Sequence, residues 1–123
     1  MINKNQLRIG NWVKSKVYGN YRIIGISVFS ESNNFYKSFK YYPQSCDSKN
    51  LLPIKITNDW LLRFGFKDKG LFFKHKSNHV IEYDSINKVY LFYLGNYGDW
   101  YKKIKYVHEL QNLFFALTSK EIS

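Results

Sequence analysis

A chain of 123 residues has the size of one domain, and it can bury about two thirds of its unfolded surface without help from disulfides or metals. Aromatic residues make up 20% of it, which favours β-sheet and excludes a disordered chain. The sequence contains no apolar run long enough for a membrane span, no apolar signal region in residues 1–6, and a single cysteine, Cys46. We therefore expect a cytoplasmic protein that makes no membrane contact.

The net charge of +10 comes from 19 Lys and Arg against 9 Asp and Glu. Such a charge favours polyanionic partners: nucleic acid, a ribonucleoprotein or an acidic protein face. Sixteen of the nineteen cations are lysine, and an AT-rich genome would enrich any protein in Lys, Asn, Tyr and Ile. A functional basic patch and codon bias are therefore both open explanations of the charge.

Residues 7–42 are expected to form three short antiparallel strands, namely Leu7–Val13, Arg22–Phe29 and Phe35–Tyr41, with a turn at Tyr18–Tyr21. Alternation in the second strand places Ile24, Ile26 and Val28 inward. A bend or bulge at Gly10-Asn11 interrupts the first strand. These features resemble part of an SH3-like or similar small open barrel.

Residues 43–55 are predicted to be a loop that joins two halves of a single domain, 1–123, although a domain boundary there is the alternative. A short helix over residues 57–64 follows, with Thr57 as N-cap, Asp59 in the first turn and Gly65 as the left-handed terminator. This helix is too short to be stable alone. It must therefore pack on the sheet through Trp60, Leu61 and Phe64.

The second half is predicted to be a β-meander over residues 70–106, with the strands Leu71–His75, Val80–Tyr83, Lys88–Leu94 and Trp100–Tyr106. Lysines protect the last of these as an edge strand.

A helix over residues 107–118 has the clearest pattern in the chain. Its apolar residues form one stripe at helical spacing: Val107, Leu110, Leu113, Phe114 and Leu117. The residues expected to face outward are His108, Glu109, Gln111 and Asn112, with Phe115 either outward, as a protein contact, or buried. The predicted fold class is α+β: antiparallel sheets, an N-terminal part that is SH3-like, a short central helix, and this C-terminal amphipathic helix packed on the sheet as a lid.

No pattern of residues predicts catalysis, a cofactor or a metal site. His75 and His79 are four residues apart, a spacing that suits two metal ligands on a helix. They flank a predicted hairpin turn instead, where this spacing does not indicate a metal site. Cys46 lies beside Asp47, whose charge disfavours a reactive thiolate. We therefore expect a protein that is not an enzyme.

Aromatic and basic residues alternate in Phe35–Tyr42 and Trp100–Tyr106, a mixture that single-stranded nucleic-acid binding uses. The predicted binding residues, for RNA or a protein surface, are Lys37, Lys40, Lys67, Lys69, Lys74, Lys76, Lys102, Lys103 and Lys105. Strand alternation in any basic protein also produces this mixture, with aromatics inward and lysines outward. The two explanations differ in the exposure of the tyrosines beside the lysines, which are Tyr36, Tyr42, Tyr101 and Tyr106. Exposed rings favour nucleic-acid binding, and buried rings favour strand alternation alone.

Three stretches occur in a characteristic order: Leu7–Val13 (LRIGNWV), Ile56–Phe66 (ITNDWLLRFGF) and Tyr106–Thr118 (YVHELQNLFFALT). Together they resemble a family of small proteins encoded by phages, prophages and mobile elements. The resemblance implies a shared fold and no catalytic residues, hence a phage-type protein that acts by binding in the host cytoplasm.

The Lys/Asn/Tyr-rich composition is also similar to that of an anti-CRISPR inhibitor of the type VI-B, RNA-targeting nuclease. The implied partner is an RNA-guided nuclease or its guide RNA, and a charge of +10 excludes mimicry of nucleic acid. The alternative is a general RNA- or single-stranded nucleic-acid-binding accessory protein of a phage.

Overall fold

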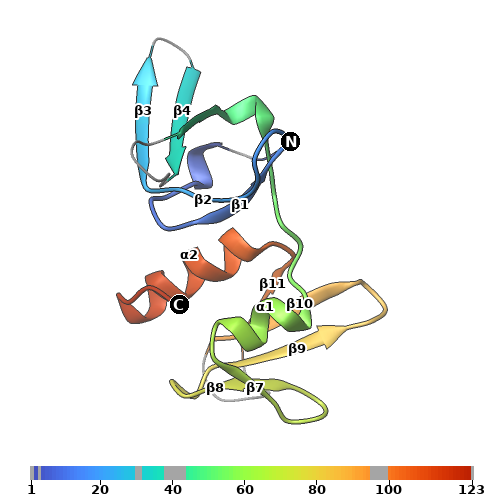
Figure 1. Ribbon diagram of the computed structural model, residues 1–123. Coiled ribbons are helices and arrows are strands. Elements are labelled where there is room, and N and C mark those ends of the chain that lie inside the picture. Colours follow the sequence, from blue (N-terminus) through green and yellow to red (C-terminus); the bar gives the residue numbers. More distant parts are fainter. Residues whose placement is uncertain (1, 3, 30–31, 38–43, 95–99, 123) are drawn as a thin grey trace. The chain divides into compact units, whose positions relative to one another are not determined.

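The computed structural model describes residues 2, 4–29, 32–37, 44–94 and 100–122, and it describes only the backbone of 4, 27–29, 32–37 and 44–48. The described part of the chain is α+β, with antiparallel sheets and two α-helices, which confirms the predicted α+β class (Figure 1). It divides into two compact units: Met1–Ile54 with Val107–Asn112 (unit 1), and Lys55–Tyr106 with Leu113–Ser123 (unit 2). A single domain over 1–123 stays a prediction. Neither α-helix in the described part of the chain is long and apolar enough to cross a bilayer.

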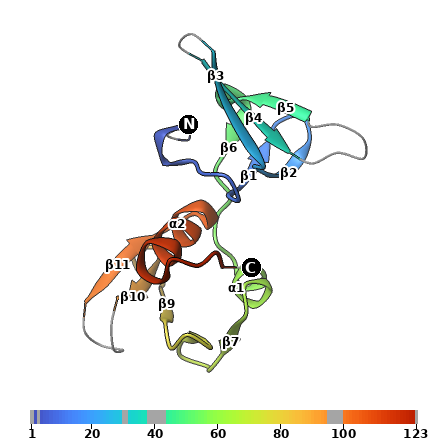
Figure 2. The same ribbon diagram turned by 90° about the vertical axis from the view of Figure 1, so that its left-hand side faces the viewer.

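Unit 1 contains two three-stranded antiparallel sheets, with the strand orders β2-β1-β6 and β3-β4-β5. Figure 2 shows β5 beside β4 in the second of them. The strands are β1 (Trp12–Ser15), β2 (Gly19–Arg22), β3 (Gly25–Phe29), β4 (Ser32–Lys37), β5 (Gln44–Asp47) and β6 (Leu51–Leu52), and short 3-10 helices cover Lys4–Gln6 and Ser48–Asn50. The SH3-like closure of these strands stays a prediction.

The prediction of one continuous strand over 22–29, after a turn at 18–21, is wrong. β2 begins at Gly19 and β3 at Gly25. Val13 pairs with Tyr21 across β1 and β2, and both are fully buried. Because this pairing directs Tyr21 inward, alternation also buries Ile23 and leaves Ile24 and Ile26 exposed, the reverse of the prediction.

The prediction of a loop over 43–55 is also wrong in part. β5 pairs with β4, with Cys46 opposite Phe35, and β6 pairs with β1, with Leu51 opposite Ser15. Each of these strands pairs with a strand outside residues 43–55, and neither shows an alternation of apolar and polar residues in the sequence. The core of unit 1 includes the buried side chains of Ile2, Leu7, Val13, Tyr21, Ile23 and Leu51.

A polar network joins the first turn of unit 1 to the N-terminal part of the helix α2 (Val107–Thr118). The Gln111 side chain accepts from the Trp12 amide (2.8 Å) and donates to the Gly10 carbonyl (2.9 Å). Asn112 Oδ1 accepts from Arg8 Nε (2.8 Å) and from Asn11 Nδ2 (2.9 Å). Two of the three stretches that carry the family resemblance therefore meet through side-chain hydrogen bonds.

The helix α2 has the predicted bounds, but its buried face is wider than the apolar stripe. Val107, Leu110 and Phe114 are buried as predicted, whereas Leu117 is exposed. The prediction that His108 and Gln111 face outward is wrong, since they are 2% and 1% exposed. For Gln111 the reason is its bonding to backbone groups, which periodicity of apolar residues does not register.

Unit 2 is built on one five-stranded antiparallel sheet with the order β11-β10-β9-β8-β7. The predicted meander over 70–106 accounts for four strands, and β11 lies at an edge as predicted. β7 was not predicted; it directly follows the end of α1 and pairs with β8. The elements are α1 (Asn58–Arg63), β7 (Phe66–Asp68), β8 (Phe73–His75), β9 (Val80–Asp84), β10 (Val89–Tyr93) and β11 (Tyr101–Ile104).

The helix α1 has the predicted ends. Thr57 Oγ1 accepts a hydrogen bond from the Trp60 amide at 3.3 Å, and Gly65 has the left-handed φ of +89° that favours glycine. One face of the sheet carries the buried side chains of Phe66, Phe73, His75, Ile81, Phe92 and Ile104, and the other face carries the buried Val80, Val89 and Tyr93. Phe114 of α2 contacts His75 and His79, with ring centroids 5.1 and 5.6 Å apart.

Candidate nucleic-acid interface

The structure separates the lysines that the sequence analysis grouped. Lys67 and Lys74 face each other across β7 and β8, and register places Lys103 on the same face of the sheet, opposite the face that carries Phe66 and Phe92. Lys69 and Lys76 follow the ends of β7 and β8. Lys102 lies on the other face, paired with Phe92. The backbone of Lys37 pairs with Gln44, its side chain is not described, and Lys40 lies outside the described residues.

Carboxylates interrupt the lysine-bearing face. Glu82 is paired with Leu91, which is itself paired with Lys103, and Glu82 accepts a hydrogen bond from the Tyr93 hydroxyl at 3.3 Å. Asp84 lies two residues farther along the same strand. Hydrogen bonds from the Asn87 side chain and amide lower the pKa of Asp84, so it stays ionised. The three lysines on this face therefore do not form a continuous cationic patch.

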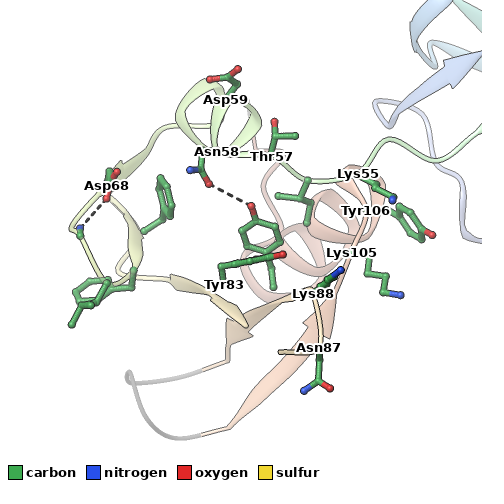
Figure 3. A pocket seen from close by; sticks show the side chains of 16 residues that line it. Lys55, Thr57, Asn58, Asp59, Asp68, Tyr83, Asn87, Lys88, Lys105 and Tyr106 are labelled. Carbon is green, nitrogen blue, oxygen red and sulfur yellow. Dashed lines mark hydrogen bonds between the residues drawn. The ribbon is translucent and has the colours of Figure 1, made fainter. Parts of the chain in front are cut away.

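A large groove lies within unit 2, with a volume of about 1160 Å³ (Figure 3). It combines lysines, aromatic rings, amides and two carboxylates. Its lining residues are Lys55, Ile56, Thr57, Asn58, Asp59, Asp68, Gly70, Leu71, Phe72, Phe73, Tyr83, Asn87, Lys88, Tyr90, Lys105 and Tyr106.

Two tyrosines from neighbouring strands form an aromatic wall of the groove. Tyr83 of β9 pairs with Tyr90 of β10, and their ring centroids are 5.0 Å apart at 55°. Tyr90 is buried and its hydroxyl donates to Asn58 Oδ1 at 3.4 Å. Burial and the nearby Tyr83 raise the pKa of Tyr90, so its hydroxyl remains a donor. Tyr83 is 49% exposed, which leaves ring surface available to a ligand.

Three lysines lie on one side of the groove. The segment before α1 runs beside the end of β11: the Ile56 amide donates to the Lys105 carbonyl at 2.9 Å, and Lys55 forms an antiparallel bridge with Tyr106. Lys88 immediately precedes β10, the neighbour of β11. Figure 3 shows Lys55, Lys88 and Lys105 on this side together with Tyr106.

The opposite side of the groove is acidic and apolar. Figure 3 shows Asp59 and Asp68 away from the three lysines. Asp68 Oδ1 accepts from the Gly70 amide at 2.8 Å, which shapes the β7–β8 turn, and Gly70 has a φ of +90°. Leu71 follows at the tip of this turn and is 86% exposed. The groove therefore has separated positive and negative sides.

Sequence reasoning identified only Lys105 among the cations of this groove. Lys55 lay in a predicted loop. Tyr83 belongs to β9 and Lys88 precedes β10, and the sequence did not specify how these strands pair. No local pattern marks these residues, because the groove forms where four segments, 55–59, 68–73, 83–90 and 105–106, meet. Tyr101 is 50% exposed and Tyr106 is partly buried, whereas the side chains of Tyr36 and Tyr42 are not described.

A second polar cluster connects two histidines in the turn between β8 and β9. Ser77 Oγ lies 2.7 Å from His75 Nδ1 and 2.8 Å from His79 Nδ1. Because His75 Nδ1 also accepts the Ser77 amide at 3.1 Å, the neutral ring carries its proton on Nε2. Ser77 then donates to His75 and accepts from His79. Nowhere in the described ranges do three His, Cys, Asp or Glu residues approach closely enough to hold a metal ion.

This cluster makes stability depend on pH. Burial, with the charges of Lys76 and His79, lowers the pKa of His75, and burial lowers the pKa of His79. The native state therefore binds fewer protons than the unfolded chain, whose histidines titrate near 6.5. We expect full stability above about pH 7.5 and a progressive loss as the pH falls through 6.5.

Urea unfolding at a series of pH values between 7.5 and 5.5 measures this dependence. The double variant His75→Gln/His79→Gln should show a flatter curve. Some slope should remain, because burial also lowers the pKa of His108, against a smaller opposing effect of Glu109. Carboxylates titrate below this window. A wild-type midpoint that does not change between these pH values contradicts the assignment of neutral, buried histidines.

Comparison of the chain with protein-family models, with curated proteins and with solved structures finds no match. The resemblance to a phage-encoded family therefore stays a prediction from the three sequence stretches.

Proposed function

We propose that the protein is a non-enzymatic binding protein and that the groove of unit 2 holds single-stranded RNA. The observation that carries this proposal is the presence of three lysines and a half-exposed tyrosine in one cavity. Proteins that bind single strands combine cations that follow the phosphates with aromatic rings on which bases stack. In this groove Lys55, Lys88 and Lys105 take the first role and Tyr83 takes the second.

The size of the groove supports an extended ligand. Pockets for small molecules have volumes of about 300–1,000 Å³, and this groove has about 1160 Å³. A duplex hides the faces of its bases, whereas a single strand exposes them to the Tyr83 ring. The net charge of +10 favours the approach of any polyanion.

A triple variant, Lys55→Gln/Lys88→Gln/Lys105→Gln, is expected to lose most of the affinity for a single-stranded RNA of about ten nucleotides. For three phosphate contacts on a single strand, log Kobs should fall with log salt with a slope of about −2 in the wild type, and this slope should approach zero in the variant. Fluorescence anisotropy at several salt concentrations measures both quantities.

The matched control is Lys67→Gln/Lys74→Gln/Lys103→Gln, which removes the same charge from three exposed lysines on the other face of the sheet. The control variant should retain the wild-type slope. If the control loses binding and the groove variant does not, RNA binds Lys67, Lys74 and Lys103 instead. Tyr83→Ala should weaken binding further, whereas Tyr83→Phe, which keeps the ring, should not. If neither the wild type nor any variant binds RNA, the proposal is excluded.

A second candidate function is inhibition of an RNA-guided CRISPR effector of type VI-B, through the nuclease or its guide RNA. Three large apolar side chains of unit 2 favour a protein contact: Leu71, Ile86 and Trp100 are 86%, 89% and 83% exposed. Exposed tryptophan is typical of binding hot spots. The phage-family resemblance motivates the choice of partner.

Addition of the purified protein to the assembled effector is expected to block cleavage of target RNA. Trp100→Ala should weaken this inhibition, whereas Val17→Ala should not, because Val17 is 68% exposed but belongs to unit 1. Cleavage that continues at saturating protein, together with no binding to the effector with or without guide RNA, rules this function out.

A further inference from the structure

The charges of the groove are arranged so that a nucleotide can bind in one orientation. Lys55, Lys88 and Lys105 lie on one side, and Asp59 and Asp68 lie away from them (Figure 3). A nucleotide is also asymmetric: its phosphate is an anion, and the edge of its base carries hydrogen-bond donors and acceptors. Attraction to the lysines and repulsion from the carboxylates both direct the phosphate to the lysine side. The base edge then faces the carboxylates.

The two carboxylates offer acceptors and no donors. Asp68 uses Oδ1 for the Gly70 amide, which leaves Oδ2 to accept from a ligand. Asp59 projects from the first turn of α1 and is exposed. An ionised carboxylate pairs only with donors. The acidic side of the groove therefore distinguishes bases by the donors they present.

We infer that the groove prefers bases with an exocyclic amino group, such as cytosine, over uracil, and that Asp59 and Asp68 are the residues that discriminate. This inference rests on the proposed binding of single-stranded RNA. Cytosine presents the N4 amino group, which a carboxylate accepts. Uracil has a carbonyl oxygen at the same position, which a carboxylate repels, and its single donor on this edge, N3–H, lies between two carbonyl oxygens.

Oligocytidine and oligouridine of equal length test this inference, because the two strands have the same backbone and differ only on the base edge, at the 4-position and at N3, which accepts in cytosine and donates in uracil. We expect the wild-type protein to bind oligocytidine at least about fivefold more tightly than oligouridine in anisotropy titrations. The double variant Asp59→Asn/Asp68→Asn should bind both strands about equally, because an amide offers donors as well as acceptors.

Glu82→Gln is the matched control, since it removes a carboxylate outside the groove, and it should keep the preference for cytosine. The single variants Asp59→Asn and Asp68→Asn show which carboxylate acts if the double variant does not fold. Equal affinities of the wild type for both strands, or a preference for uracil, overturn the inference and leave the proposed function in place. A preference that survives the double variant overturns the assignment of the two residues. Absence of binding to either strand instead overturns the proposed function.

Discussion

Replacement of Phe114 by alanine is expected to lower the free energy of unfolding by about 3–5 kcal/mol. The Phe114 side chain is only 4% exposed and its ring contacts those of His75 and His79. The variant buries less apolar surface on folding. It also leaves a cavity beside the two histidine rings, which hydrogen bonds to Ser77 hold in place. Urea unfolding at pH 7.5, where the histidines are neutral, measures the loss.

The adjacent residue provides the control. Phe115 has the same side chain in the same helix and is 39% exposed, so Phe115→Ala should cost much less, about 1 kcal/mol or below. The comparison keeps residue type and helix propensity constant and varies only the burial. Equal losses for the two variants would mean that Phe114 is not part of the core of unit 2.

Gln111→Leu is expected to destabilise the protein by about 2–4 kcal/mol, although leucine has a similar volume and is apolar. The Gln111 side chain is 1% exposed and serves both the Trp12 amide and the Gly10 carbonyl. Leucine cannot replace either hydrogen bond, and each backbone group without a partner costs about 1–3 kcal/mol. Hydrophobicity alone would predict that leucine at this buried position raises the free energy of unfolding.

Two measurements check this result. The urea midpoint should fall with little change in the slope, and hydrogen exchange at the Trp12 amide should become faster. The control Ala116→Leu introduces leucine at an exposed position of the same helix and should change stability little. Unchanged protection of the Trp12 amide in Gln111→Leu would show that the side chain does not hold the first turn of unit 1.

The elements with strong local signals were predicted well. The apolar stripe from Val107 to Leu117 predicted the bounds of α2, although Leu117 is exposed, and Thr57 and Gly65 predicted the ends of α1. Alternation in the second half predicted four strands of the five-stranded sheet. In each case, residues within a few positions of one another contain the information, because capping and side-chain periodicity act over one or two turns.

Errors occurred where a distant partner decides the structure. Alternation alone placed Ile24 and Ile26 inward, but pairing of Tyr21 with Val13 reverses the face. β5 and β6 lay in a predicted loop, since their hydrogen bonds come from β4 and β1. A shift of one residue moves every side chain of a strand to the other face, so register must be known before burial can be assigned.

The candidate site depends even more on tertiary structure. Composition and charge indicated a basic, aromatic-rich protein, apolar spacing indicated the α+β class, and the charge alone made a polyanionic partner the expectation. Only the folded chain brings Lys55, Lys88 and Lys105 to one side of a groove with Tyr83 in its wall, and leaves Lys67 and Lys74 on another face. The physical reason is that charge is a sum over residues, whereas a binding site is a set of distances between segments far apart in the sequence.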